Sequence, residues 1–126
     1  MEYFAHARLH TSPQRLQEQL VLEALPRFCV SIEKLLETGP DHARVWCLWG
    51  EFRVRRECIR DGVRFTLPDC PNALAWTITA EADSARALVH LAINRSRPEE
   101  DFDASIRTFM NDWVQGLEAG RERLQA

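Results

Sequence analysis

Four side chains in this sequence are of a type that could do chemistry. His6 and His10 are four residues apart, which on a helix would point two imidazoles at one metal ion, but their segment alternates like a strand and has no third ligand. Cys70 lies in a loop bracketed by prolines, where a thiol becomes a nucleophile if its pKa is lowered. His90 lies among apolar residues of a predicted strand. We therefore predict no catalytic residue, no metal ion and no cofactor, and keep an enzyme using Cys70 or His90 as the third hypothesis.

Sequence motifs and charge exclude several further classes of function. No stretch matches a phosphate-binding loop, a nucleophile elbow, a dinucleotide fingerprint or a paired zinc motif. The cysteines are too widely spaced for a zinc cluster or a disulfide framework; they are Cys29, Cys47, Cys58 and Cys70. The net charge of the chain is −3, and residues 51–64 carry five arginines and three acidic residues. Such a mixture suits a solvated cross-strand pattern better than a nucleic-acid surface.

The aromatic residues are the main candidates for binding. The four tryptophans are many for this length, and aromatic side chains spread over strands and a helix form either a core or the wall of an apolar pocket. Gly116 and Gly120 lie one turn apart on the closing helix, and each costs the helix about 1 kcal/mol relative to alanine. We therefore expect this helix to approach the sheet or a second chain closely.

The elements that must position these residues centre on a hairpin at residues 51–67. Apolar and charged residues alternate there with the two-residue period of a strand, and Asp61-Gly62 supplies the turn. Pairing Arg60 with Val63 puts the apolar side chains on one face; they are Phe52, Val54, Cys58, Val63, Phe65 and Leu67. Residues 43–50 feed into this hairpin, and residues 74–80 and 86–94 read as a third and a fourth strand.

Helices are predicted on both sides of the strands. After residues 3–10, whose alternation allows a short strand, a capping box at residues 11–14 starts a helix that runs to Gly39 and is kinked or split at Pro26. Apolar residues three or four apart from Phe102 to Leu124 predict an amphipathic closing helix. The fold class is therefore α+β, one domain over residues 1–126, with an N-terminal helix, a four-stranded antiparallel sheet and a C-terminal helix packed on it.

The setting of the protein follows from what the sequence lacks. No basic region followed by an apolar run begins the chain, and the longest uncharged run is too short to cross a membrane. We therefore expect a cytoplasmic protein with no membrane partner. Lys34 is the only lysine beside many arginines, which indicates a bacterial genome of high GC content.

Two resemblances suggest functions. The strand at residues 87–93, the acidic connector and the helix from Phe109 to Leu124 resemble the ending of type III secretion chaperones, which are small dimeric proteins that hold an unfolded effector segment. Those chaperones carry a further helix where this chain has only residues 81–85. The chain also resembles helix-grip, START-like domains, in which a long C-terminal helix closes an antiparallel sheet over an apolar ligand cavity. This resemblance implies an aromatic cavity wall, with the candidate residues Trp46, Phe52, Phe65, Trp76, Phe109 and Trp113. Those domains have more strands, so this chain would be a reduced version.

The preferred hypothesis is a non-enzymatic protein-binding module that acts as a homodimer or as a small chaperone or adaptor. Its contact surface would be an exposed strand edge or the Gly116 and Gly120 side of the last helix. The alternative is a binder of a small apolar molecule with a cavity under that helix. An enclosed pocket of about 300 Å³ or more lined by the tryptophans would favour the alternative.

Overall fold

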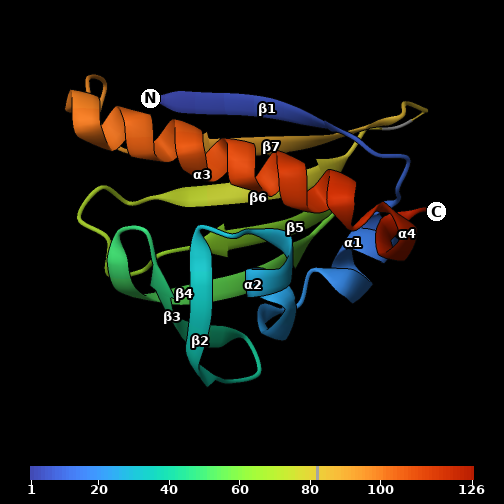
Figure 1. Ribbon diagram of the computed structural model, residues 1–126, viewed down its shortest axis with the longest axis horizontal. Coiled ribbons are helices and arrows are strands. Elements are labelled where there is room, and N and C mark those ends of the chain that lie inside the picture. Colours follow the sequence, from blue (N-terminus) through green and yellow to red (C-terminus); the bar gives the residue numbers. More distant parts are fainter. Residues whose placement is uncertain (82) are drawn as a thin grey trace.

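The computed structural model describes residues 1–81 and 83–126. Within them, seven strands form one antiparallel sheet in the order β1-β7-β6-β5-β4-β3-β2 (Figure 1). The strands are β1 (Glu2–Arg8), β2 (Ile32–Thr38), β3 (His42–Cys47), β4 (Gly50–Ile59), β5 (Gly62–Thr66), β6 (Ala75–Ala80) and β7 (Arg86–Ala92). The helices are α1 (Pro13–Gln19), α2 (Leu25–Phe28), α3 (Glu100–Ala119) and α4 (Arg121–Leu124), with a 3-10 turn at Leu22–Ala24. The fold is α+β, but the expectation of a four-stranded sheet is wrong.

The chain starts at one edge of the sheet and crosses to the other through its first helices. β1 pairs with β7, and α1 and α2 lead to β2 at the far edge (Figure 1). From β2 onward each strand pairs with the next, which brings β7 back beside β1. Pro26 lies in the first turn of α2, where its missing N–H costs no hydrogen bond, so it starts a short helix and does not kink a long one.

β2 occupies the second half of the helix predicted over residues 11–39. Ile32 pairs with Cys47 and Leu35 pairs with Val45, so both face the interior although they are three residues apart. The register shift between Ile32 and Lys34 produces this spacing, because a bulge adds a residue to one strand only, and a second shift follows between Leu35 and Glu37. Inward-facing residues three apart look like one face of a helix, which is why the sequence pattern predicted the wrong element.

The run at residues 43–50 is divided by a turn that the sequence reading missed. β3 ends at Cys47, β4 begins at Gly50, and these two residues pair. Gly50 has φ +107, a conformation that favours glycine. The turn residues are Leu48 and Trp49. The predicted first strand is therefore two strands, and Trp49 lies at a hairpin end.

The central hairpin, β4 and β5, forms with the predicted face but in another register. The structure pairs Ile59 with Gly62, so the turn is Arg60-Asp61 and not Asp61-Gly62. A shift of two residues keeps each side chain on its expected face. Gly62 lets the backbone of β6 approach β5 closely. A Cβ at this position would overlap the carbonyl oxygen of Ile78 and lie 3.0 Å from its carbonyl carbon.

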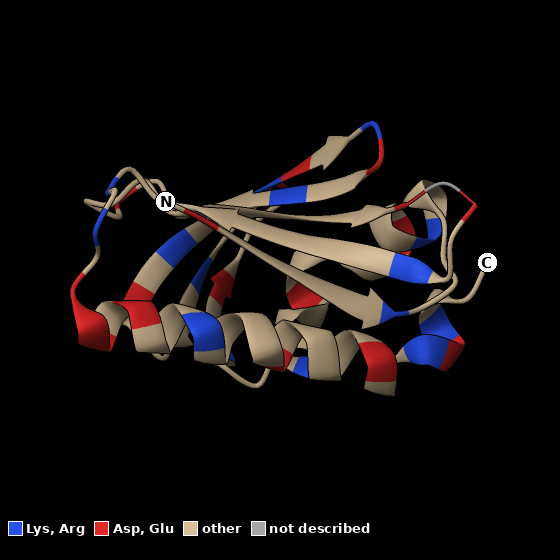
Figure 2. Ribbon diagram, turned by 90° about the horizontal axis from the view of Figure 1, so that it is seen from above, with Lys and Arg blue, Asp and Glu red and all other residues tan. Residues whose placement is uncertain are grey.

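α3 is amphipathic, and its charged residues, which are coloured along the ribbon in Figure 2, are exposed or half-buried. Glu100, Asp101 and Asp103 lie in its first turn, where they stabilise the positive end of the helix dipole. Its buried residues are Ile106, Phe109, Met110, Trp113 and Leu117. In the part of the chain that the structure describes, no helix is long and apolar enough to cross a membrane.

Gly116 and Gly120 bring α3 against α2. A Cβ on Gly116 would overlap the carbonyl oxygen of Phe28 and lie 2.5 Å from its carbonyl carbon. A Cβ on Gly120 would lie 2.6 Å from Cε1 of the Phe28 ring. The close approach that the glycines predict is therefore made to a short helix of the same chain, and this side of α3 is covered.

Candidate functional site

The structure separates the predicted binding residues into three groups. Phe65, Trp76, Phe109 and Trp113 are fully buried between the sheet and α3. Phe52 is half-buried at one end of this layer. Trp46 is 44% exposed and points to the outer face of the sheet, away from the others.

The four buried rings fill the space that a helix-grip resemblance would assign to a ligand. Phe65 stacks on Trp76 with ring centroids 5.3 Å apart, and Trp76 contacts Phe109 edge to face at 4.9 Å. Trp113 completes the cluster, with its centroid 6.0 Å from that of Phe65. Among the described residues, Nε1 of Trp76 and Nε1 of Trp113 are buried without a hydrogen-bond partner. These contacts make the centre of the layer a packed core.

One end of the layer stays open as an apolar cleft of about 170 Å³. It is lined by Trp49, Phe52, Leu67, Cys70, Pro71, Asn72, Leu74 and Phe102. We call these residues the apolar cleft. They come from the β3–β4 turn, the beginning of β4, the β5–β6 loop and the beginning of α3, which meet at one end of the sheet (Figure 1). The volume lies below the roughly 300 Å³ of pockets for drug-sized ligands.

Trp49 forms the wall between the cleft and the core. Its Nε1 donates to Oγ of Ser105 at 2.8 Å, and its ring lies 4.8 Å from that of Phe109 and 6.2 Å from that of Phe102. The hydroxyl of Ser105 in turn donates to the carbonyl oxygen of Phe102 at 2.6 Å. Trp49 is therefore held in one orientation by α3. The sequence reading missed Trp49 and Phe102, although a tryptophan beside the turn glycine Gly50 was an available signal.

The β5–β6 loop forms the other wall and is tied by its own backbone. The N–H of Cys70 donates to the carbonyl of Leu67 at 3.0 Å, and the N–H of Leu67 donates to that of Leu74 at 3.0 Å. Asn72 is oriented by Arg95, whose Nε donates to Oδ1 of Asn72 at 2.6 Å. The amide nitrogen of Asn72 is then the donor end of the side chain. The cleft is apolar, with Asn72 and the Cys70 thiol as polar groups in its lining.

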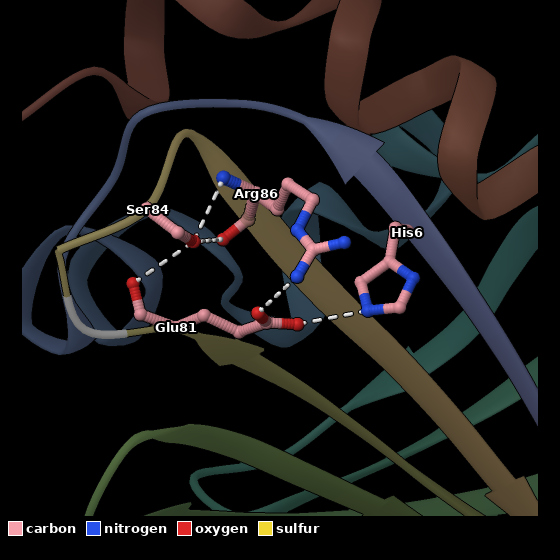
Figure 3. Close-up of polar contacts among 4 residues, drawn as sticks. All are labelled: His6, Glu81, Ser84 and Arg86. Atoms are coloured by element: carbon pink, nitrogen blue, oxygen red, sulfur yellow. Dashed lines mark hydrogen bonds and ion pairs between the residues drawn. The ribbon is translucent and has the colours of Figure 1, made fainter.

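His6 and His90 lie on the other face of the sheet, and His10 is an exposed residue after the end of β1. His90 stacks on Phe4 with centroids 4.6 Å apart, and its Nε2 lies 2.8 Å from Oε1 of Glu2. His6 contacts Glu81, with Nε2 and Oε1 2.8 Å apart, and Arg86 binds the other oxygen of Glu81 at 3.0 Å (Figure 3). The described residues contain no group of three or more His, Cys, Asp or Glu side chains that could hold a metal ion. His90 and Cys70 are on opposite faces, so they do not form a catalytic pair.

Burial accounts for the strongest shifts in pKa. It raises the pKa of the Cys29 thiol to about 12, and it also raises the pKa of Cys47. Both side chains are therefore inert thiols in the core. Burial and a hydrogen bond from its hydroxyl to Asp103, 2.7 Å long, raise the pKa of Tyr3 to about 12.

Two arginines on the β3–β4 side of the sheet pair with acids. Nε and one terminal nitrogen of Arg53 bind the two oxygens of Asp69, in the β5–β6 loop, at 2.8 and 3.0 Å, which lowers the pKa of Asp69. Arg44 on β3 bridges Glu37 of β2 and Glu51 of β4 at 3.1 and 3.2 Å. The Arg44 pairs run across neighbouring strands, whereas the Arg53 pair ties the hairpin to a loop.

Comparisons with known proteins place the fold. No family model matches the chain, and no curated protein matches its sequence. A solved structure of an uncharacterised protein from Bacillus thuringiensis is similar, with TM-score 0.68 and 13% identity over 97% of this chain and 99% of that one. The di-domain ARO/CYC StfQ from the steffimycin biosynthetic pathway matches with TM-score 0.63 and 14% identity, over 97% of this chain and 46% of that one. Ara h 8.0201 matches with TM-score 0.59 and 13% identity, over 94% of each chain.

The fold and these likenesses define a helix-grip protein, a long C-terminal helix laid on an antiparallel sheet. The second of the two resemblances is therefore confirmed at the level of the fold. The seven strands leave no reason to regard the chain as a reduced version. The resemblance to type III secretion chaperones is wrong, because the similar structures share the helix-grip fold.

Proposed function

We propose that this protein binds a small apolar molecule, about the size of one aromatic ring, in the apolar cleft. The observation that carries the proposal is a cleft of about 170 Å³ with an apolar lining, at the end of the layer between α3 and the sheet. A dry apolar cavity of about 150 Å³ in a protein core is enough to hold benzene. The likeness to StfQ, which belongs to a biosynthetic pathway for a small molecule, supports the same class of function.

The lining indicates which ligand fits. Trp49 and Phe102 offer ring faces and edges, and Phe52, Leu67 and Leu74 complete an apolar wall. The amide nitrogen of Asn72 is the group that can donate to an acceptor on the ligand. A molecule with one aromatic ring and a single carbonyl or hydroxyl oxygen would pack on the apolar wall and accept a hydrogen bond from Asn72.

Binding without catalysis is part of the proposal. Cys70 borders the cleft, but its loop brings no histidine to it, and His90 is engaged with Phe4 and Glu2 on the other face of the sheet. A cysteine nucleophile needs a base or a nearby positive charge to be activated. Alkylation of Cys70 by iodoacetamide at the rate of free cysteine would support this view, and a rate at least tenfold higher would contradict it.

The four tryptophans supply an internal control for a binding experiment. Titration of the ¹⁵N-labelled protein with benzyl alcohol, followed by the indole N–H signals, should shift the Trp49 signal to saturation. The Trp46 signal should stay in place, because Trp46 lies on the outer face. Phe52→Trp, which fills the cleft, should weaken binding at least tenfold, and Trp46→Phe should leave it unchanged. Equal shifts of Trp46 and Trp49, or none in either, would refute the proposal.

A further inference from the structure

The two edges of the sheet differ in how they are protected. β2, at one edge, has two register shifts, and such bulges prevent another strand from pairing with an edge. β1, at the other edge, pairs with β7 without interruption from Glu2 to Arg8. β1 is the uppermost strand in Figure 1 and has a neighbour, β7, on one side only. A regular edge strand is a template for a further strand.

In an antiparallel pair, every second residue of a strand bonds to the neighbouring strand, so the bonds between β1 and β7 show which backbone groups of β1 face outward. Met1 and Ile93 exchange both backbone bonds, at 3.2 and 3.0 Å, and the N–H of Leu9 donates to Ala85 at 3.0 Å. Odd-numbered residues of β1 therefore bond to β7, and even-numbered residues direct their N–H and C=O groups away from it.

Part of this outward row is already used by the end of the chain. The N–H of Arg8 donates to Oε2 of Glu118 at 2.7 Å, and Arg121 donates to the carbonyl of Arg8 at 3.0 Å. The N–H of Ala126 donates to the carbonyl of His10 at 3.1 Å. The segment from Glu2 to His6 is the part of the edge that these contacts leave open.

A groove of about 550 Å³ runs beside this open segment. β1 forms one side, and Arg107, Met110, Asn111 and Val114 of α3 form the other. A strand added to the edge points every second side chain toward α3. The groove gives these side chains a surface to pack on, so both the backbone and the side chains of an added strand find partners.

The open segment is complementary to itself. In antiparallel pairing of two copies centred on Phe4, each Glu2 lies opposite the His6 of the other copy, and the two Phe4 rings lie opposite each other. Phe4 is 61% exposed, and its ring is held by stacking on His90 at 4.6 Å. All three residues direct their backbone groups outward, so each pair in this register exchanges two hydrogen bonds. Facing aromatic rings stabilise a cross-strand pair, and a carboxylate can accept a hydrogen bond from an imidazole N–H.

We propose that β1 is a homodimer interface, in which two copies pair antiparallel through Glu2, Phe4 and His6 to form one continuous sheet. The partner is a second copy of this chain, because its segment supplies the outward backbone groups, the imidazole opposite the carboxylate and the facing ring in the correct register. The interface shares no residue with the apolar cleft, so this inference is independent of the proposed ligand.

Sedimentation velocity and light scattering of the untagged chain test the inference. At about 100 µM the wild type should have twice the monomer mass of 14.6 kDa. Phe4→Pro should give the monomer, because it removes an N–H that points away from β7 and proline is tolerated on an open edge. Phe4→Lys should also give the monomer, since it places two positive charges opposite each other and keeps the backbone intact. Leu36→Lys, at an exposed position on the opposite edge, should remain a dimer.

Hydrogen exchange locates the interface independently of folding defects in a variant. The amides of Glu2, Phe4 and His6 should exchange at least tenfold more slowly at a concentration that gives dimer than at one that gives monomer. If Phe4→Pro does not fold, Phe4→Lys decides the question. A monomeric wild type at 100 µM, a dimer that persists in Phe4→Lys, or fast exchange of these three amides in the dimer would overturn the proposal.

Discussion

Gly116→Ala tests the packing of α3 on α2. The new Cβ would overlap the carbonyl oxygen of Phe28 and lie 2.5 Å from its carbonyl carbon and 3.1 Å from its Cα. Backbone atoms of a buried segment cannot rotate away as a side-chain end can, so α2 and α3 would have to separate. Inserting a methyl group into a packed interior costs about 1 to 3 kcal/mol of stability. Because the new methyl group meets backbone atoms, we expect a cost at the upper end, about 3 kcal/mol. Alanine regains about 1 kcal/mol of helix propensity.

The net expectation is a loss of about 2 kcal/mol in the free energy of unfolding, from the difference between overpacking and helix propensity. For a domain of this size, that loss lowers the Tm by roughly 6 to 10 °C. Urea unfolding followed by circular dichroism measures the free energy, with an m-value that should not change. The variant should keep the far-ultraviolet spectrum of the wild type, since α3 itself stays helical.

Gly120→Ala, at the residue that ends α3, is the matched comparison. Its Cβ would meet Cε1 of the Phe28 ring at 2.6 Å, and a ring edge can tilt where a carbonyl cannot. We expect a loss of less than about 1 kcal/mol, at the low end of the cost of overpacking, because the contact is with a side chain that can move. A Gly116→Ala variant as stable as the wild type, or less destabilised than Gly120→Ala, would show that the reasoning about backbone contact is wrong.

Three further predictions follow from single contacts. Nε of Arg56 donates to the carbonyl of Leu20, at the end of α1, at 2.8 Å. Arg56→Met should therefore lower the free energy of unfolding in urea by about 2 kcal/mol, because hydrogen bonds to charged groups contribute about 1.5 to 3 kcal/mol. Tyr3 is the single tyrosine, so a titration of absorbance at alkaline pH should give its pKa, which we expect near 12. Because folding raises this pKa, the contribution of the Tyr3 hydroxyl to stability should be complete below pH 10 and lost as the pH rises toward 12. Asp103→Asn should lower that pKa, and an unshifted value would contradict the assigned hydrogen bond. Trp113→Ala should lower the free energy of unfolding by about 3 to 5 kcal/mol, because its side chain is fully buried, and a loss under about 1 kcal/mol would show that it is not core.

The candidate site was predictable in part. Phe52 was named as a wall residue through the helix-grip resemblance, and it does line the apolar cleft. Trp49 and Phe102, which close the cleft, were not named because their roles depend on a turn at residues 48–49 that brings the β3–β4 hairpin end to α3. Trp46 was named with the other aromatic residues, but the alternation of β3 turns it to the outer face. A list of aromatic residues therefore does not separate core, cleft and surface.

Local patterns determined the two elements with uninterrupted periodicity. α3 follows the spacing of its apolar residues, and the hairpin of β4 and β5 shows the predicted face, because period 3.6 and period 2 are set by backbone geometry alone. The α+β class follows from the same patterns. The register of the hairpin does not, because the contact of Gly62 with β6 outweighs the turn preference of Asp-Gly.

Tertiary structure alone decided the number of strands and the function that the fold supports. The bulges of β2 exist because a strand must curve around the core while it pairs with β3, and they give the sequence a helical appearance. The packing of Phe65, Trp76, Phe109 and Trp113 closes the centre of the layer and leaves only its end open to a ligand. In the β2–β3 pairing and in the aromatic core, residues distant in sequence come into contact. The pattern of residues along the chain does not specify which of them will do so.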